Sequence, residues 1–254
     1  MKFYRVLPYI LGAFILLVGC KTTHLADIQP DSYRISPEVE AKDAGVETMI
    51  SPYRQQLQSE MEQVIGEAAM DLPKGSRDDA ESLLGNWYAD LLHERSEHYL
   101  GKPIDFAVMN NGGIRIPVIP KGPVTKGKIY ELMPFDNMMV VVYLDKANVM
   151  EMISHMAAGG GWPVSRPLQY KIRDGKPIKI TLNGEPLPND KIYAVGVSDY
   201  LANGGGRCDY LVGQKRDDLG VFMRDAIIEY IQKQTEEGKK LAAKLDGRVE
   251  IVGE

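Results

Sequence analysis

One run of seven residues, MMVVVYL at positions 138–144, constrains the fold of this chain most. The run carries no charge, and valine-rich segments of this length are typical of strands. Polar residues do not alternate with the apolar ones, so both faces of such a strand must be covered. The sequence therefore predicts a buried strand in a sheet that other elements pack against on both sides.

Segments of helical character precede and follow this strand. Apolar residues recur at spacings of three and four, which predicts four helices, over residues 53–72, 83–92, 149–156 and 222–231. Ser76 and Asp79 have the spacing of a capping box in front of the second helix. Asp145 can cap the third helix in the same manner.

Further strands interleave with these helices. The expected ones are IDFAVM at 104–109, KIYAVGV at 191–197 and RVEIVG at 248–253. In IKITLNGEPL, at 178–187, apolar residues alternate around Asn183-Gly184, which is a strong hairpin signal. A hairpin among helices and strands favours an α+β fold, with a mixed β-sheet and flanking helices, over a doubly wound parallel sheet.

The N-terminus has the pattern of a signal peptide. Lys2 and Arg5 precede a short apolar run that ends in LVGC, which resembles a bacterial lipobox with Cys20 as the lipidated residue. The alternative is an ordinary signal peptide, or a short anchor, with an incidental cysteine. We therefore expect a signal peptide at 1–19, a tether at 20–45 and a folded domain at 46–254. We also expect a lipid anchor that holds the chain in a bacterial cell envelope.

Charge argues against a nucleic-acid-binding protein, and cysteine content argues against a fold held together by disulfides. The chain has 254 residues and a net charge of −5, and removal of 1–19 takes away two positive charges and no negative ones. An acidic protein is a poor partner for a nucleic-acid backbone, so we expect no nucleic-acid binding. Cys20 and Cys208 are the two cysteines. If Cys20 carries lipid, Cys208 has no partner and the fold uses no disulfide.

Two glycine-rich loops that follow strands are candidate ligand loops. In NNGGIR, at 110–115, Gly112 and Gly113 permit positive φ and close backbone approach. Asn110 offers donors and an acceptor, and Arg115 offers a planar fork for an anion. Neither a phosphate-binding P-loop nor a GxGxxG motif is present. A tight turn with a surface arginine is the alternative.

The second glycine-rich loop is SDYLANGGGRC, at 198–208. It has the same character, with Asn203 in front of three glycines. Two loops of this kind can meet at one edge of a sheet, where ligands often bind. Phe135 lies in a turn between Pro134 and Asp136, where it can either stack on a planar ring or fill a loop. Trp162 is expected in the core or at its rim.

No catalytic residue and no metal site is expected in this chain. The four histidines are His24, His93, His98 and His155, and none lies in a His-x-His or Asp-x-His pair. The sequence also lacks the G-x-S-x-G motif of serine hydrolases. We therefore expect no cofactor in this chain.

Several motifs, in order, resemble the C-terminal domain of bacterial and animal 5′-nucleotidases. They are ESLLGNWYADLL, NNGGIR, GPVTKGKIYELMPFDNMMVVVYL and LNGEPLPNDKIYAVGVSDYLANGGG. In that family the domain is α+β and binds the nucleoside end of the substrate. The resemblance covers about residues 45–254, and the segment from Tyr53 to Leu72 looks like the family's linker helix.

The resemblance assigns roles to individual residues. Asn110 and Arg115 would contact the ligand, and Phe135 and Tyr200 would hold the base between two aromatic faces. The candidate substrate-binding residues are Asn110, Gly112, Gly113, Arg115, Phe135, Tyr200 and Asn203.

Two positions depart from the family pattern. Gly206 stands where the family commonly has Asp, with Asp209 three residues further on. Asp78 stands where the family has an upstream Arg, and Arg77 is one position away. The family's metallophosphatase domain has no counterpart in this sequence.

These observations leave three hypotheses. In the first, the chain is the substrate-binding half of a 5′-nucleotidase-type hydrolase in nucleotide catabolism. It would then act with a separate metallophosphatase subunit that supplies the divalent metals. In the second, it is a lipoprotein that binds nucleosides or nucleotides without catalysis. In the third, it is a structural lipoprotein with a degenerate site.

Overall fold

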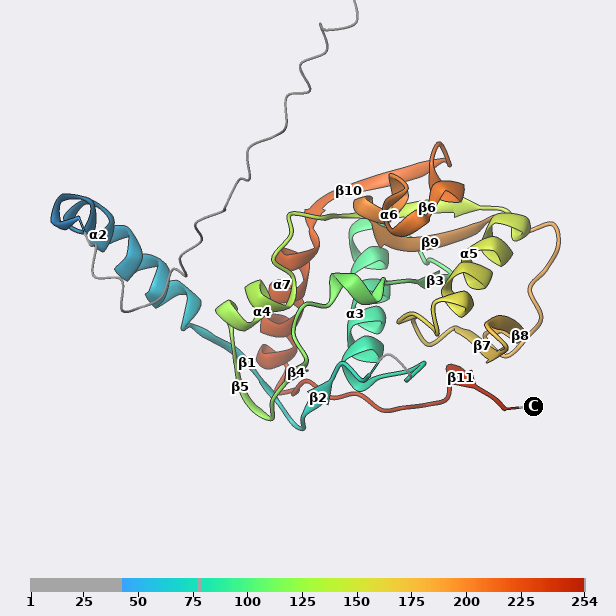
Figure 1. The fold of residues 1–254 in the computed structure, drawn as a ribbon, viewed down its shortest axis with the longest axis horizontal. Helices are drawn as coiled ribbons and strands as arrows, with labels where there is room; N and C mark the ends of the chain where they lie inside the picture. The colour runs from blue at the N-terminus through green and yellow to red at the C-terminus, as the bar shows by residue number, and fades with distance from the viewer. Residues whose placement is uncertain (1–42, 77–78, 254) are drawn as a thin grey trace, which may run out of the picture. The chain divides into compact units, whose positions relative to one another are not determined.

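The computed structural model describes residues 43–76 and 79–253, and Figure 1 shows the fold. The chain divides into two units, Met1–Met49 and Ile50–Glu254, and only residues 43–49 of the first are described. The signal peptide, Cys20 and most of the tether therefore lie outside the described residues. No helix in the described ranges is long and apolar enough to cross a membrane.

The α-helices of the described residues are α2 (Ala44–Met61), α3 (Leu83–Leu100), α4 (Lys126–Leu132), α5 (Lys146–Ala158), α6 (Asp199–Ala202) and α7 (Met223–Glu236). The strands before residue 150 are β1 (Val64–Ala68), β2 (Leu72–Pro73), β3 (Phe106–Ala107), β4 (Val118–Ile119), β5 (Gly122–Thr125) and β6 (Met138–Leu144). The later strands are β7 (Leu168–Arg173), β8 (Lys176–Leu182), β9 (Tyr193–Ser198), β10 (Arg216–Phe222) and β11 (Val249–Ile251).

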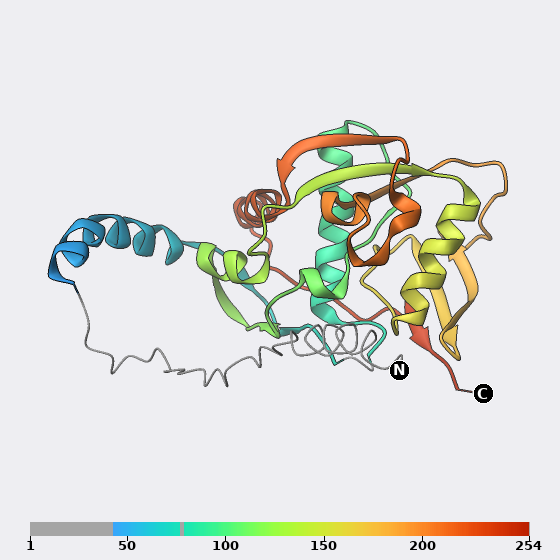
Figure 2. The same cartoon turned by 45° about the horizontal axis from the view of Figure 1, so that its top comes forward.

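A four-stranded sheet in the order β10-β6-β9-β3 forms the centre of residues 50–254. Strand β6 pairs antiparallel with β10 and with β9, whereas β3 pairs parallel with β9. Figure 2 shows β6 and β10 running side by side as long ribbons. The sheet is therefore mixed, and the α+β fold expected from the sequence is confirmed.

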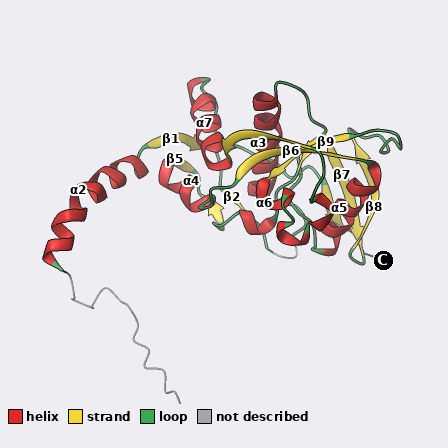
Figure 3. Cartoon of the chain, turned by 90° about the horizontal axis from the view of Figure 1, so that it is seen from above, coloured by secondary structure: helices red, strands yellow, loops and turns green. Residues whose placement is uncertain are grey.

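Both faces of the central sheet are covered, as the apolar run of β6 predicts. Met139 and Val141 belong to one hydrophobic cluster, with side chains of α3, α4 and α7. Val140 and Val142 belong to a second cluster, with α5 and the sheet β11-β7-β8. Figure 3 shows α5 beside β7 and β8 on this second side. Each valine of β6 thus removes apolar surface from water on one side of the sheet.

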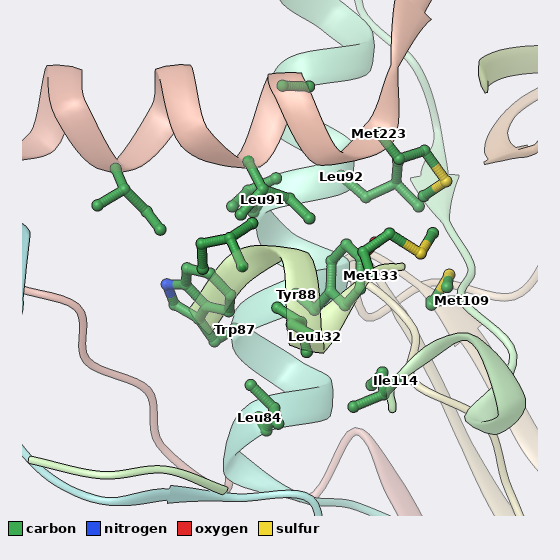
Figure 4. Close-up of a cluster of buried hydrophobic side chains, with 14 of the residues drawn as sticks. Leu84, Trp87, Tyr88, Leu91, Leu92, Met109, Ile114, Leu132, Met133 and Met223 are labelled. Carbon is green, nitrogen blue, oxygen red and sulfur yellow. The ribbon is translucent and has the colours of Figure 1, made fainter. Parts of the chain in front are cut away.

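Helix α3 forms the centre of the first cluster. Ser82 caps it by accepting a hydrogen bond from the Gly85 N–H (3.0 Å), and Gly101 ends it in the left-handed conformation. Figure 4 shows side chains of α3 gathered with those of Leu132, Met133 and Met109. The helix expected over 83–92 is confirmed and extends to residue 100.

The helix expected over residues 53–72 is wrong in its second half. Helix α2 ends at Met61, and the following apolar residues belong to β1 and β2. Ile65 is buried because α7 packs on β1. A Cβ at Gly66 would lie 2.5 Å from Ile231 Cγ2. In α2 itself no residue is buried, and Tyr53 is 74% exposed. The periodic spacing therefore continued from a helix into a strand.

Two further expectations need correction. The tight hairpin lies at Asp174-Gly175, between β7 and β8, and both residues have positive φ. Asn183-Gly184 also turns with positive φ, but only one bridge, Leu182 to Glu185, follows it. The Asn-Gly signal thus predicted the turn correctly and the second strand wrongly.

The capping box at Ser76 starts no helix. The Ser76 N–H donates to Asp79 Oδ2 (2.7 Å), but the helix begins at Leu83, capped by Ser82. A local side-chain bond of this kind stabilises a turn equally well.

Candidate functional site

Three loops meet at one edge of the central sheet. Because β3 and β9 are parallel, the loops that follow them leave the sheet at the same end. Strand β6 is antiparallel to β9, so the loop before β6 lies at this end too. The two glycine-rich loops and the Phe135 turn, far apart in the sequence, are thereby brought together.

Tyr200 lies against the backbone of its own loop. A Cβ at Gly205 would lie 2.5 Å from Tyr200 Cε2, so only glycine lets the ring rest there. The Tyr200 hydroxyl oxygen accepts a hydrogen bond from the Gly206 N–H (3.0 Å). The side chain is nevertheless 46% exposed. One face of the ring is therefore held by the protein while the residue remains accessible to a ligand.

Phe135 is also accessible, at 41% exposure. One arginine contacts its ring, and a second binds its backbone carbonyl. The Arg115 guanidinium carbon lies 5.6 Å from the Phe135 ring centroid, within the range of a cation–π contact. Arg224 of α7 donates to the Phe135 carbonyl (3.3 Å) and pairs with Asp136 (2.7 Å). No sequence pattern pointed to Arg224, because its role depends on α7 packing beside this turn.

The NNGGIR loop is anchored mainly through its backbone. The Arg115 N–H donates to the Leu132 carbonyl (3.0 Å), and Arg115 Nη1 lies 3.4 Å from the Gly112 carbonyl oxygen. Asn111 donates to the Gly161 carbonyl (2.9 Å). Asn110 is half-buried and starts the turn. Arg115 is thus left exposed at the rim, with its guanidinium held near Phe135.

Of the two properties that glycine permits here, positive φ is not used, because neither Gly112 nor Gly113 adopts that conformation. Gly113 is buried, and a Cβ there would overlap the Met109 methyl group. Glycine is needed at position 113 for space rather than for a left-handed turn. Gly112 is exposed and lines a cavity described below.

Asn203 and Asp199 tie the second loop to the sheet. Asn203 Oδ1 accepts from Arg216 of β10 (2.7 Å), so this oxygen already has a partner. Asp199 Oδ1 accepts from the Met138 N–H (3.0 Å) and the Tyr200 N–H (2.8 Å). Asp199 thereby links the loop that carries Tyr200 to the start of β6, three residues after Phe135. Sequence reasoning missed Asp199, since its partner at the start of β6 is distant in sequence.

A cavity of about 890 Å³ adjoins these loops. Gly112 lines it from the first loop, Gly206 from the second, and Trp162 from the segment after α5. Trp162 is half-buried and makes an edge-to-face contact with His155, at 5.2 Å between ring centroids. The expectation of Trp162 at the rim of the core agrees with its contact to the second cluster.

The described residues do not offer a metal site. No group of three or more His, Cys, Asp or Glu side chains in the described ranges could hold an ion. His93 contacts Ser165 and Glu97, and His155 makes an edge-to-face contact with Trp162. Cys208 is buried and has no disulfide partner in this part of the chain. His24, Arg77 and Asp78 lie outside the described residues.

The comparisons with known proteins agree with this architecture. The chain belongs to the 5′-nucleotidase C-terminal domain family, whose model matches residues 64–213. The crystal structure of a 5′-nucleotidase precursor from Thermus thermophilus superposes with a TM-score of 0.70 and 30% identity. That match covers 84% of this chain and 44% of the Thermus chain.

Two curated relatives are similarly distant and much longer. The endonuclease YhcR of Bacillus subtilis is 27% identical over 233 residues, which cover 87% of this chain. The protein UshA of Escherichia coli is 28% identical over 210 residues, or 79% of this chain. The chain spans 18% of the length of YhcR and 36% of that of UshA.

Proposed function

We propose that this chain is the nucleoside-binding half of a 5′-nucleotidase-type hydrolase and that a separate metallophosphatase protein completes it. The whole would hydrolyse phosphomonoesters of nucleotides in nucleotide catabolism. The observation that carries the proposal is the meeting of Phe135, Tyr200 and Arg115 at one sheet edge, with both aromatic side chains exposed.

In this proposal Phe135 and Tyr200 hold the base by stacking, which contributes about 1–3 kcal/mol per base in nucleic-acid systems. Arg115, next to Phe135, offers hydrogen bonds to the polar groups of the nucleoside. Asn110, Gly112, Gly113 and Asn203 form the loops that carry these groups or contact the ligand directly.

The metals belong to the partner in this proposal, because the described residues provide no suitable ligand set. When bound there, two divalent ions would activate water and stabilise the leaving oxygen. This chain contributes by fixing the position and orientation of the nucleoside, which lowers the entropic part of the barrier.

The first experiment is calorimetric titration of the purified chain with adenosine and with AMP, in the presence of EDTA. We expect binding that needs no metal and that Phe135→Ala and Tyr200→Ala each weaken by about tenfold, the loss of one stacking contact. Tyr53→Ala is the matched control, since it removes an exposed aromatic ring of α2. Binding unaffected by both site variants would contradict the proposal.

A second experiment tests the partner. Cross-linking followed by affinity purification of the chain should recover a protein with a metallophosphatase domain, and the mixture should hydrolyse AMP. Nucleoside binding without such a partner or activity would favour a non-catalytic binding lipoprotein instead.

The lipid anchor is a further part of the proposal. The LVGC sequence supports lipidation of Cys20 and a position at the bacterial cell envelope. Mass spectrometry of the N-terminal peptide should find a diacylglyceryl group on Cys20, and Cys20→Ser should release the chain from the membrane fraction. An unmodified Cys20 would contradict it.

A further inference from the structure

Gly206 joins the cavity of about 890 Å³ to Tyr200, because it lines the cavity and donates its N–H to the Tyr200 hydroxyl oxygen (3.0 Å). A Cβ at Gly206 would lie 3.9 Å from Tyr200 Cε1 and 3.7 Å from Trp162 Cη2. Gly206 therefore separates the proposed base site from the cavity and brings no side chain of its own. On the other side, Gly112 lines the cavity and its carbonyl faces Arg115. A ligand held at Phe135 and Tyr200 can thus extend into the cavity.

Arg207 lines this cavity in an unusual conformation. Its φ is +65°, a region that costs a residue with a Cβ about 1–2 kcal/mol. The side chain is exposed, and within the described part of the chain its guanidinium makes no hydrogen bond or ion pair. A strained backbone that presents an unpaired cation to a cavity points to a ligand.

Lys74 is a second cation on the wall of the cavity. Its ammonium group donates to the Ile114 carbonyl (2.7 Å), directly before Arg115 in the sequence. Burial and the nearby positive charge of Arg115 hold the pKa of Lys74 below its usual value. Among the described residues no carboxylate is within ion-pair distance of Lys74, so an anion would relieve the repulsion.

Two carboxylates, Asp79 and Glu81, also line the cavity, but backbone N–H groups occupy them. Asp79 accepts from the Ser76 N–H (2.7 Å), and this bond holds the pKa of Asp79 below its usual value. Glu81 accepts from the Asp246 N–H (2.9 Å) and the Gly247 N–H (3.0 Å). Neither carboxylate pairs with Arg207 or Lys74.

We propose that the cavity is a second subsite, in which Arg207 and Lys74 bind a phosphate group other than the one presented for hydrolysis. The preferred ligands are then nucleotides that carry a second phosphate. This preference rests on the proposed function for the nucleoside end, whereas the phosphate site itself does not. Charge-assisted hydrogen bonds from a guanidinium and an ammonium group suit such a ligand.

The phosphate site is tested with inorganic pyrophosphate and tryptophan fluorescence of the full chain. Trp162 lines the cavity, and Trp162→Phe identifies its share of the signal. We expect a saturable change that Arg207→Gly weakens by about tenfold, the effect of one charge-assisted hydrogen bond. Glycine adopts positive φ freely, so this variant keeps the backbone. Lys102→Ala, a cation outside the cavity, should change nothing. No saturable signal, or equal binding by Arg207→Gly, overturns the proposal.

The nucleotide preference is tested by calorimetry with AMP and adenosine 3′,5′-bisphosphate. The bisphosphate should bind about tenfold more tightly than AMP, and Arg207→Gly should abolish this difference. If AMP binds through Phe135 but the bisphosphate gains nothing, the preference is wrong and the proposed function stands. If pyrophosphate binds through Arg207 but adenosine does not bind at all, the phosphate site stands and the proposed function fails.

Discussion

The two glycine-rich loops leave the same edge of the sheet, yet their glycines serve different purposes. In the loop at 110–115 the backbone stays at negative φ, and Gly113 provides the space that Met109 fills. In the loop at 203–207 Gly204 and Gly206 have positive φ, and Gly205 makes room for the Tyr200 ring. The first loop is thus shaped by the core beneath it, and the second by a residue of the candidate site. The two loops are similar in sequence, but we expect their glycines to differ in how well they tolerate substitution.

The largest effect should come from Gly205→Ala. The added methyl group would overlap the Tyr200 carbonyl oxygen and lie 2.5 Å from its ring, so backbone and ring must both move. We expect a loss of about 2–3 kcal/mol in the free energy of unfolding, at the upper end for overpacking. Adenosine affinity should fall at least as far as in Tyr200→Ala. Urea denaturation and calorimetry measure the two effects, and unchanged affinity would show that Tyr200 is not placed by Gly205.

Gly113→Ala should cost less, about 1–2 kcal/mol in the free energy of unfolding. The group it meets is the end of the flexible Met109 side chain, which can rotate, although it is buried. In the double variant Gly113→Ala, Met109→Ala the loss in the free energy of unfolding should be smaller than the sum of the losses in the two single variants, because the two residues are in contact. Purely additive effects in urea denaturation would contradict the contact.

Arg207→Gly should slightly increase stability, by about 0.5 kcal/mol. It removes the cost of a Cβ at positive φ, about 1–2 kcal/mol, but increases the chain entropy of the unfolded state by part of that amount. A thermal melt of the variant against the parent measures the difference. A less stable variant would mean that the Arg207 side chain has a structural partner.

Gly112→Ala is the smallest change and completes the comparison. A Cβ there would lie 3.2 Å from Asn110 Nδ2, and φ is negative, so we expect a stability change within about 0.5 kcal/mol. A large loss on urea denaturation would show that this loop, like the second one, depends on glycine conformation.

The sequence predicts those elements best whose signals are local. The apolar run of β6, the Asp145 cap of α5 and the helical spacing of α3 each lie within a few residues, and the structure contains all three elements. Asp145 Oδ1 accepts from the Asn148 N–H (2.8 Å), as its position before α5 predicts.

Prediction from the sequence fails where one pattern of apolar residues fits both a helix and a strand. Ile65 and Leu72 continue the helical spacing of α2, but they are buried in strands, because α7 packs on β1 and α3 packs on β2. Neither Arg224 nor Asp199 stood out, because the bonds that give them roles join residues far apart in sequence. The candidate loops could be picked out by composition, whereas their meeting at one edge depends on the parallel pairing of β3 with β9.

That pairing also determines when the candidate site can form. Phe106 lies opposite Val195, and the chain between them must fold back before the two strands can meet. Closing a loop of this length is entropically costly, and contacts between residues so distant in sequence are slow to form. Strand β9 also needs β6 on its other side. The two glycine-rich loops should therefore come together late in folding, so that nucleoside binding would report a completely folded chain during refolding.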